Sequence, residues 1–139
     1  RTTEATPWDF VNAFAARDTA RCLLLLQRMR SVSPHALMPM CTARLRELIC
    51  AKSMAARGNT TPRALAAALT DYAKIANEKA RPKQDWQVRD HVSCARRFTA
   101  DELRAALISA RNTEQAMKSG ADPDAAFREW VVGVTAKRR

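Results

Sequence analysis

Residues 33–58 read SPHALMPMCTARLRELICAKSMAARG and contain the longest helical pattern in the chain. Ser33 and Pro34 are a start signal, because a serine hydroxyl accepts hydrogen bonds from free backbone N–H groups and proline fits the first helical turn. Gly58 is a stop signal, because glycine readily adopts the left-handed conformation that ends many helices. One apolar face repeats between them, formed by Leu37, Cys41, Leu45 and Leu48. A helix of about 24 residues would measure roughly 36 Å and cross the whole domain.

Two shorter helices are predicted before this stretch. Thr6 and Pro7 should begin the first, over residues 7–15, with Phe10, Val11 and Phe14 on its apolar face. Asp18 is the expected N-cap of the second. The inward face of that second helix is predicted to consist of Leu23, Leu24, Leu26 and Met29, widened by Leu25.

The middle of the chain gives weaker signals. A polar break precedes Pro62, which should begin a short helix that contains Leu65 and Leu69. Residues 70–83 then include several cations and few large apolar side chains. This segment is therefore expected to form either a solvated helix or a loop.

Three further helices are predicted to complete the chain. One runs from Trp86 to residue 95, and the next begins at the capping box of Thr99 and Glu102 and ends at Gly120. The last begins at Asp122-Pro123, has apolar residues at helical spacing and ends at residues 137–139. Strand signals are almost absent. The sequence thus predicts an all-α fold, a single bundle of about five to seven helices.

The composition excludes several functional classes. The three glycines among the 139 residues stand too far apart for a glycine-rich nucleotide or phosphate loop. Wholly apolar runs, such as residues 22–26 and 64–69, are far shorter than the roughly 20 residues of a membrane span. We find no signal-peptide pattern and no initiating methionine. We therefore expect residues 1–139 to be one domain, the C-terminal fragment of a longer cytoplasmic protein.

No constellation of side chains indicates catalysis, a metal or a cofactor. The cysteines are expected to be free thiols, namely Cys22, Cys41, Cys50 and Cys94. His91 and Cys94 are spaced as half of a zinc site, but no second pair supplies the other two ligands that tetrahedral zinc requires. Paired carboxylates stand at predicted helix starts, where capping explains them. We expect no catalytic residue, no cofactor and no metal in this chain.

The net charge of +10 favours acidic partners. The surplus is spread along the chain, without a long block of lysine and arginine. This distribution is typical of solvated helix faces, although it would also support weak, salt-sensitive contact with DNA phosphates. A basic helical nucleic-acid-binding domain is therefore the alternative function.

Several short motifs follow one another in a familiar order, at residues 8–14, 23–26, 44–48, 86–89, 95–99, 102–107 and 117–120. Together they resemble the C-terminal domain of the delta subunit of the bacterial DNA polymerase III clamp loader, over nearly the whole chain. The motif residues include Trp86, Arg96, Phe98, Leu103, Leu107, Lys118 and Gly120. Ala16-Arg17-Asp18 departs from the usual Gly-Asp turn of that family, and residues 70–83 resemble an insertion.

The resemblance implies an interaction domain. In that family an N-terminal portion opens the sliding clamp during DNA replication, without ATP hydrolysis by this subunit. The C-terminal helical domain joins the ATPase subunits and delta-prime in a pentameric collar. On this interpretation, four apolar residues of the last helix either pack in the core or meet a neighbouring subunit, namely Phe127, Trp130, Val131 and Val134. Arg96 and Arg97 would fix a helix end, cross an interface or face DNA, and Trp86 is expected to anchor the core.

Overall fold

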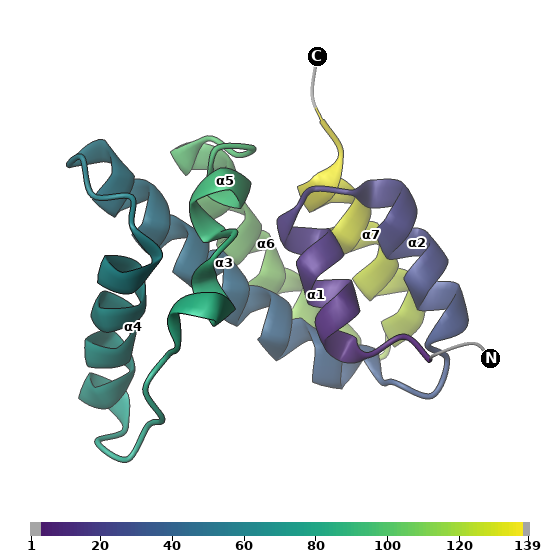
Figure 1. The fold of residues 1–139 in the computed structure, drawn as a ribbon. Coiled ribbons are helices and arrows are strands. Elements are labelled where there is room, and N and C mark those ends of the chain that lie inside the picture. Colours follow the sequence, from purple (N-terminus) through teal and green to yellow (C-terminus); the bar gives the residue numbers. More distant parts are fainter. Residues whose placement is uncertain (1–3, 138–139) are drawn as a thin grey trace.

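The computed structural model describes residues 4–137, which form seven α-helices and one 3₁₀ helix (Figure 1). In chain order these are α1 (Pro7–Ala15), α2 (Thr19–Arg28), α3 (Pro34–Ala56), α4 (Pro62–Ala76), η1 (Asp85–Val88), α5 (His91–Ala95), α6 (Ala100–Lys118) and α7 (Pro123–Thr135). Within the described range there is no β-strand. The predicted all-α bundle is confirmed.

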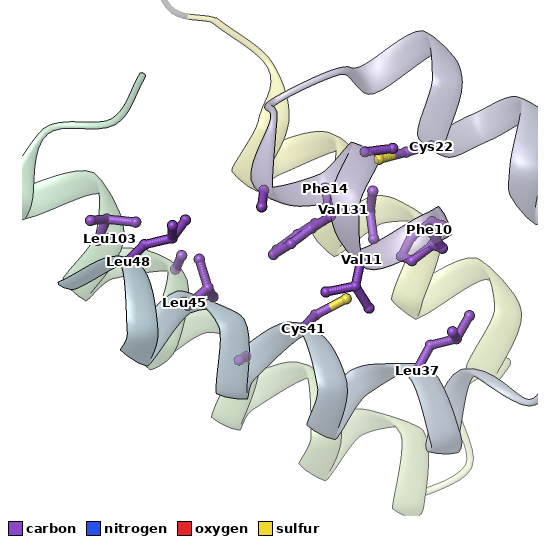
Figure 2. Packing of buried hydrophobic residues seen from close by; sticks show 14 of the residues in the cluster. Phe10, Val11, Phe14, Cys22, Leu37, Cys41, Leu45, Leu48, Leu103 and Val131 are labelled. Carbon is purple, nitrogen blue, oxygen red and sulfur yellow. The ribbon is translucent and has the colours of Figure 1, made fainter. Parts of the chain in front are cut away.

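Helix α3 is the central element of the bundle. It packs against α1, α4, α5, α6 and α7, and Figure 1 shows α1, α2 and α7 near one end of it and α4 at the other. Its predicted apolar face is buried, with Leu45 and Leu48 fully inaccessible to solvent. Figure 2 shows that face meeting side chains of α1, α6 and α7, among them Phe10, Phe14, Leu103 and Val131. The pattern in residues 33–58 therefore organises the core.

Helix starts follow the capping signals in the sequence. The side chains of Thr6 and Asp18 accept hydrogen bonds from the backbone N–H groups of Asp9 and Arg21, at 3.3 and 3.1 Å. Thr99 forms the predicted capping box, because its hydroxyl accepts from the N–H of Glu102 at 3.0 Å while its own N–H donates to that carboxylate at 2.8 Å. These bonds satisfy N–H groups that the helices leave free.

Three helices end in the same left-handed turn. Gly58 after α3 and Gly120 after α6 have φ values of +83° and +102°, as the sequence predicts. After α1 the same position is occupied by Arg17, with φ of +60°. The N–H of Asp18 then donates to the carbonyl of Ala13 at 3.0 Å, which closes the turn. Arginine thus adopts a conformation that costs roughly 1–2 kcal/mol for a residue with a Cβ.

The predicted inward face of α2 is right for Leu25 and Met29, but it includes Leu24 and omits Cys22. Cys22, Leu25 and Met29 are buried, while Leu24 is exposed. Residues 23–26 are all leucine, so every side of this helix carries apolar residues and the sequence leaves its rotation open. Packing against α1 and α7 decides which side is buried.

The segment between α3 and α6 also differs from expectation. Helix α4 continues through Ala76, so the first half of residues 70–83 is helical, as the solvated-helix alternative predicts. Residues 77–84 form the connection that follows. The helix predicted over residues 86–95 is instead η1 followed by the short α5. Helix α7 ends at Thr135; Lys137 lies beyond it, and residues 138–139 fall outside the described range.

Candidate functional site

The side chain of Arg17 joins three turns of the bundle, in what we call the Arg17 junction. Its guanidinium donates two hydrogen bonds to the Glu102 carboxylate, from Nη1 to Oε1 at 3.0 Å and from Nη2 to Oε2 at 2.7 Å. It also donates to the backbone carbonyls of Arg97, Thr135 and Ala136 at 2.5, 3.2 and 3.1 Å. The same group lies 4.8 Å from the centre of the Phe98 ring. One side chain therefore connects the end of α1, the start of α6 and the end of α7.

The junction is electrostatically matched. The Arg17 side chain is only 7% exposed, and Glu102 neutralises it. The hydrogen bond from Arg17, together with the capping bonds of Thr99, lowers the pKa of Glu102 from 4.5 to about 2. In return, Arg97 donates from Nη1 to the carbonyl of Ala16 at 3.0 Å. The turn at Ala16-Arg17 and the turn before α6 are thus bonded in both directions.

A second feature is a groove between α1, the first half of α3 and η1, which we call the tryptophan groove. It has a volume of about 680 Å³. Trp8 on α1 and Trp86 on η1 line it with 60% and 69% of their surfaces exposed, and Met40 of α3 also lines it. The lining also includes the cationic residues Arg44, Lys83 and Arg89.

An ion cluster centred on Glu47 forms one wall of the tryptophan groove. The Glu47 carboxylate accepts from Nε2 of buried His91 at 2.7 Å and from Nζ of Lys83 at 2.9 Å, and Nε of Arg44 lies 3.6 Å away. Burial would raise the pKa of Glu47, but the hydrogen bonds from His91 and Lys83 outweigh it and leave the pKa below its ordinary value. Glu47 is therefore an ionised, fully partnered carboxylate.

Backbone contacts hold the connection that supplies Lys83 and Trp86. The N–H of Lys83 donates to the Thr70 hydroxyl at 2.8 Å, and that hydroxyl donates to the carbonyl of Ala66 at 2.7 Å. The N–H of Gln84 donates to the side chain of Gln87 at 2.8 Å, which begins η1. Helix α4 packs against η1. Residues 83–88 are consequently fixed against α4, with Trp86 facing outward.

A third feature is a groove of about 690 Å³ between α6 and α7, which we call the α6–α7 groove. Small side chains and Gly133 form much of its lining, to which Trp130, Val134 and the acidic Glu129 contribute, and the ion pair of Arg17 and Glu102 lies in the same lining. A Cβ atom built at Gly133 would meet nothing within 4 Å. The groove therefore has room for side chains from outside this chain.

The structure separates the predicted site residues into buried and accessible groups. Phe127 and Val131 are fully buried and Trp130 is 5% exposed, because they pack against α1, so none of the three presents an exposed apolar side chain to a neighbour. Val134 is half-buried and Arg97 is exposed. Trp86, expected as a core anchor, is instead exposed, because η1 buries only Val88. The remaining motif residues include two that lie in the core, Phe98 and Leu103, and one that is half-buried, Leu107. The other three lie on the surface, namely Arg96, Lys118 and Gly120.

The candidate zinc ligands are not gathered into a site. His91 is bonded to Glu47, and no group of three potential ligands occurs anywhere in residues 4–137. All four cysteines are free thiols. Burial raises the pKa of Cys22 to about 12, and it raises the pKa of Cys41 further still. None of the helices described here has the length and apolarity needed to cross a membrane.

Comparison of the chain with models of protein families, with curated proteins and with solved structures finds no match.

Proposed function

We propose that this chain is the collar domain of a clamp-loader delta subunit, a non-catalytic module that holds its subunit in a pentameric assembly. The all-helical bundle agrees with what the sequence resemblance implies. In such a protein a separate N-terminal part would open the sliding clamp, and the whole complex would act in DNA replication in the cytoplasm. The partners of this domain would be the collar domains of the ATPase subunits and of delta-prime.

The observation that supports this proposal best is the Arg17 junction. Three motif residues that are close in sequence, Phe98, Thr99 and Glu102, take part in this contact network with Arg17, which lies about 80 positions earlier in the chain. Arg17, at the point where the family has a Gly-Asp turn, adopts the left-handed conformation that glycine favours. The departure in sequence therefore keeps the turn that the family pattern requires.

The α6–α7 groove is the surface that we assign to assembly. It is lined by Val134, a half-buried residue that is predicted to meet a neighbouring subunit. Its lining combines small residues with charged ones: the exposed carboxylates of Asp101 and Glu129, and the ion pair of Arg17 and Glu102. Such a lining suits a partner helix that presents apolar residues with a cation beside them.

Assembly can be tested by mixing the chain with folded collar domains of the ATPase subunits and delta-prime. We expect a larger species in size-exclusion chromatography with light scattering at tens of micromolar protein. Gly133→Leu should abolish this species by filling the α6–α7 groove, whereas Gly133→Ala, which adds one methyl group into open space, should retain it. The absence of any complex with folded partners would refute the collar function, and a complex unaffected by Gly133→Leu would refute the assigned surface.

A further inference from the structure

The outer side of α4 carries the two most exposed large apolar side chains in residues 4–137. Tyr72 is 74% exposed and Ile75 is 84% exposed. With half-buried Ala68 they stand at i, i+4 and i+7, which places all three on one side of the helix. We call these three residues the α4 patch. A different side of α4 packs in the core, so the α4 patch is an apolar surface that the described part of the chain leaves uncovered.

The surroundings of the α4 patch are basic. Residues 62–81 contain four cations, Arg63, Lys74, Lys79 and Arg81, and two anions, Asp71 and Glu78. Lys74 is exposed and stands between Tyr72 and Ile75 in the sequence. The α4 patch therefore combines large apolar side chains with a positive charge beside them.

The α6–α7 groove has the opposite character. Three carboxylates line it, namely Asp101, Glu102 and Glu129, and the one cation in its lining, Arg17, is bonded to Glu102. Asp101 also pairs with Arg104, whose side chain is exposed to solvent. The groove itself is acidic, which is unexpected on a chain whose net charge is +10. Its small side chains and Gly133 leave room for large ones from outside.

The α4 patch thus has the large side chains and the positive charge that complement the α6–α7 groove. The two surfaces do not meet within one molecule, because α4 lies near one end of α3 and α7 lies near the other (Figure 1). We infer that the chain associates head-to-tail, with the α4 patch of one copy seated in the α6–α7 groove of a second copy. This inference rests on the assignment of that groove to assembly, and it names the helix that fills the groove.

Sedimentation equilibrium of the chain alone, from about 10 µM to about 1 mM, tests the inference. We expect the weight-average mass to rise with concentration above the monomer value of 15.5 kDa. It should not level off at the dimer, because a contact between two different faces leaves one copy of each face free. Added salt should reduce the association, since the contact brings opposite charges together.

Two variants each remove one half of the contact. Tyr72→Ala combined with Ile75→Ala removes the α4 patch, and Gly133→Leu fills the α6–α7 groove. Each variant alone should weaken self-association by at least about tenfold. An equimolar mixture of the two should form a 1:1 heterodimer, because the first keeps an intact groove and the second keeps an intact α4 patch. A contact between like faces would instead be lost in one variant and kept in the other.

Trp8→Ala is the matched control. Trp8 is also an exposed aromatic residue, but it lies on α1 and belongs to neither surface. This variant should self-associate within about twofold of the wild-type chain, since surface substitutions away from a site rarely matter. Because Tyr72, Ile75 and Trp8 are largely exposed and Gly133 faces open space, circular dichroism should show all the variants folded.

Two outcomes would overturn the inference. One is a wild-type chain that stays monomeric at about 1 mM, and the other is a mixture of the two variants that does not associate. The collar function is judged separately, from the mixture with the ATPase subunits and delta-prime. A chain that is monomeric alone but joins those partners would overturn only the head-to-tail contact. A chain that self-associates but ignores them would overturn the collar function and leave this contact in place.

Discussion

Replacement of Arg17 should separate two opposing effects at a single position. Its guanidinium stabilises the fold through the hydrogen bonds to Glu102 and to three backbone carbonyls. Its backbone, with φ of +60°, is strained. Arg17→Ala loses the side-chain contacts and keeps the strain. Arg17→Gly loses the same contacts and relieves the strain, so the pair of variants measures each effect.

The structure sets the expected magnitudes. Removal of one partner from a buried ion pair costs about 3–5 kcal/mol, and because Glu102 is 30% exposed we expect about 3 kcal/mol for Arg17→Ala. Glycine recovers about 1 kcal/mol of backbone strain, so Arg17→Gly should cost about 2 kcal/mol. Arg21→Ala removes an exposed arginine of α2 and should change stability by less than about 0.5 kcal/mol.

Urea unfolding followed by circular dichroism would measure the three variants. The reasoning is refuted if Arg17→Ala is no less stable than Arg21→Ala, which would mean that the junction contributes nothing. It is also refuted if the glycine and alanine variants have equal stability, because the left-handed backbone would then cost nothing.

Acid adds an independent test of the same junction. The pKa of Glu102 is lowered in the folded chain from 4.5 to about 2, so the unfolded chain takes up the proton first as the pH falls. The contribution of the ion pair is therefore fully present above about pH 5 and is lost as the pH drops toward 2. After allowance for partial exposure of the carboxylate, this loss should be about 2 kcal/mol. Arg17→Ala should show a smaller loss over the same range, and an identical acid profile would contradict the pairing.

Three further results follow from burial. Trp130→Ala should lower the free energy of unfolding by about 3–5 kcal/mol in urea, since the centre of its ring lies 5.2 Å from that of Phe14. Trp86→Ala should lower it by less than about 0.5 kcal/mol. Similar losses for the two variants would contradict their opposite environments. Cys22 and Cys41, buried with raised pKa values, should resist Ellman's reagent until the chain is denatured, and rapid labelling of the native chain would refute this. Gly133→Ala should stabilise the chain by about 0.5–1 kcal/mol in thermal unfolding, because alanine has a higher helix propensity than glycine and the added methyl group meets no atom within 4 Å. A loss of stability would contradict the open space at this position.

Local signals in the sequence predict the helix ends well. The capping residues Thr6, Ser33 and Thr99 act on N–H groups two or three positions away, so the neighbouring residues contain all the information that is needed. The same holds for Gly58 and Gly120, whose effect is on their own backbone. The buried side of α2 is not predicted well, because a run of four leucines leaves this helix without a distinct apolar face in the sequence.

The sites depend on contacts between distant residues, which one sequence does not reveal. Glu47 and His91 are 44 positions apart, and Arg17 and Glu102 are 85 apart. The prediction of Trp86 as a core anchor is wrong, because the exposure of this residue depends on how η1 packs against α4. Two local signs of the junction are present in the sequence: the departure from the Gly-Asp turn at residues 16–18, and the capping box of Thr99 and Glu102.

The peripheral position of α4 has a consequence for the order in which the chain opens. This helix packs chiefly against α3 and η1, while α3 is covered by helices on several sides. Its outer face includes exposed Tyr72 and Ile75, and only one side of it, with Leu65, Ala66 and Leu69, is buried. Amide hydrogens of α4 should therefore exchange with deuterium well before those of α3. Because η1 rests on α4, each such opening would also free Trp86, and the exchange rate of α4 would set how often one edge of the tryptophan groove is rebuilt.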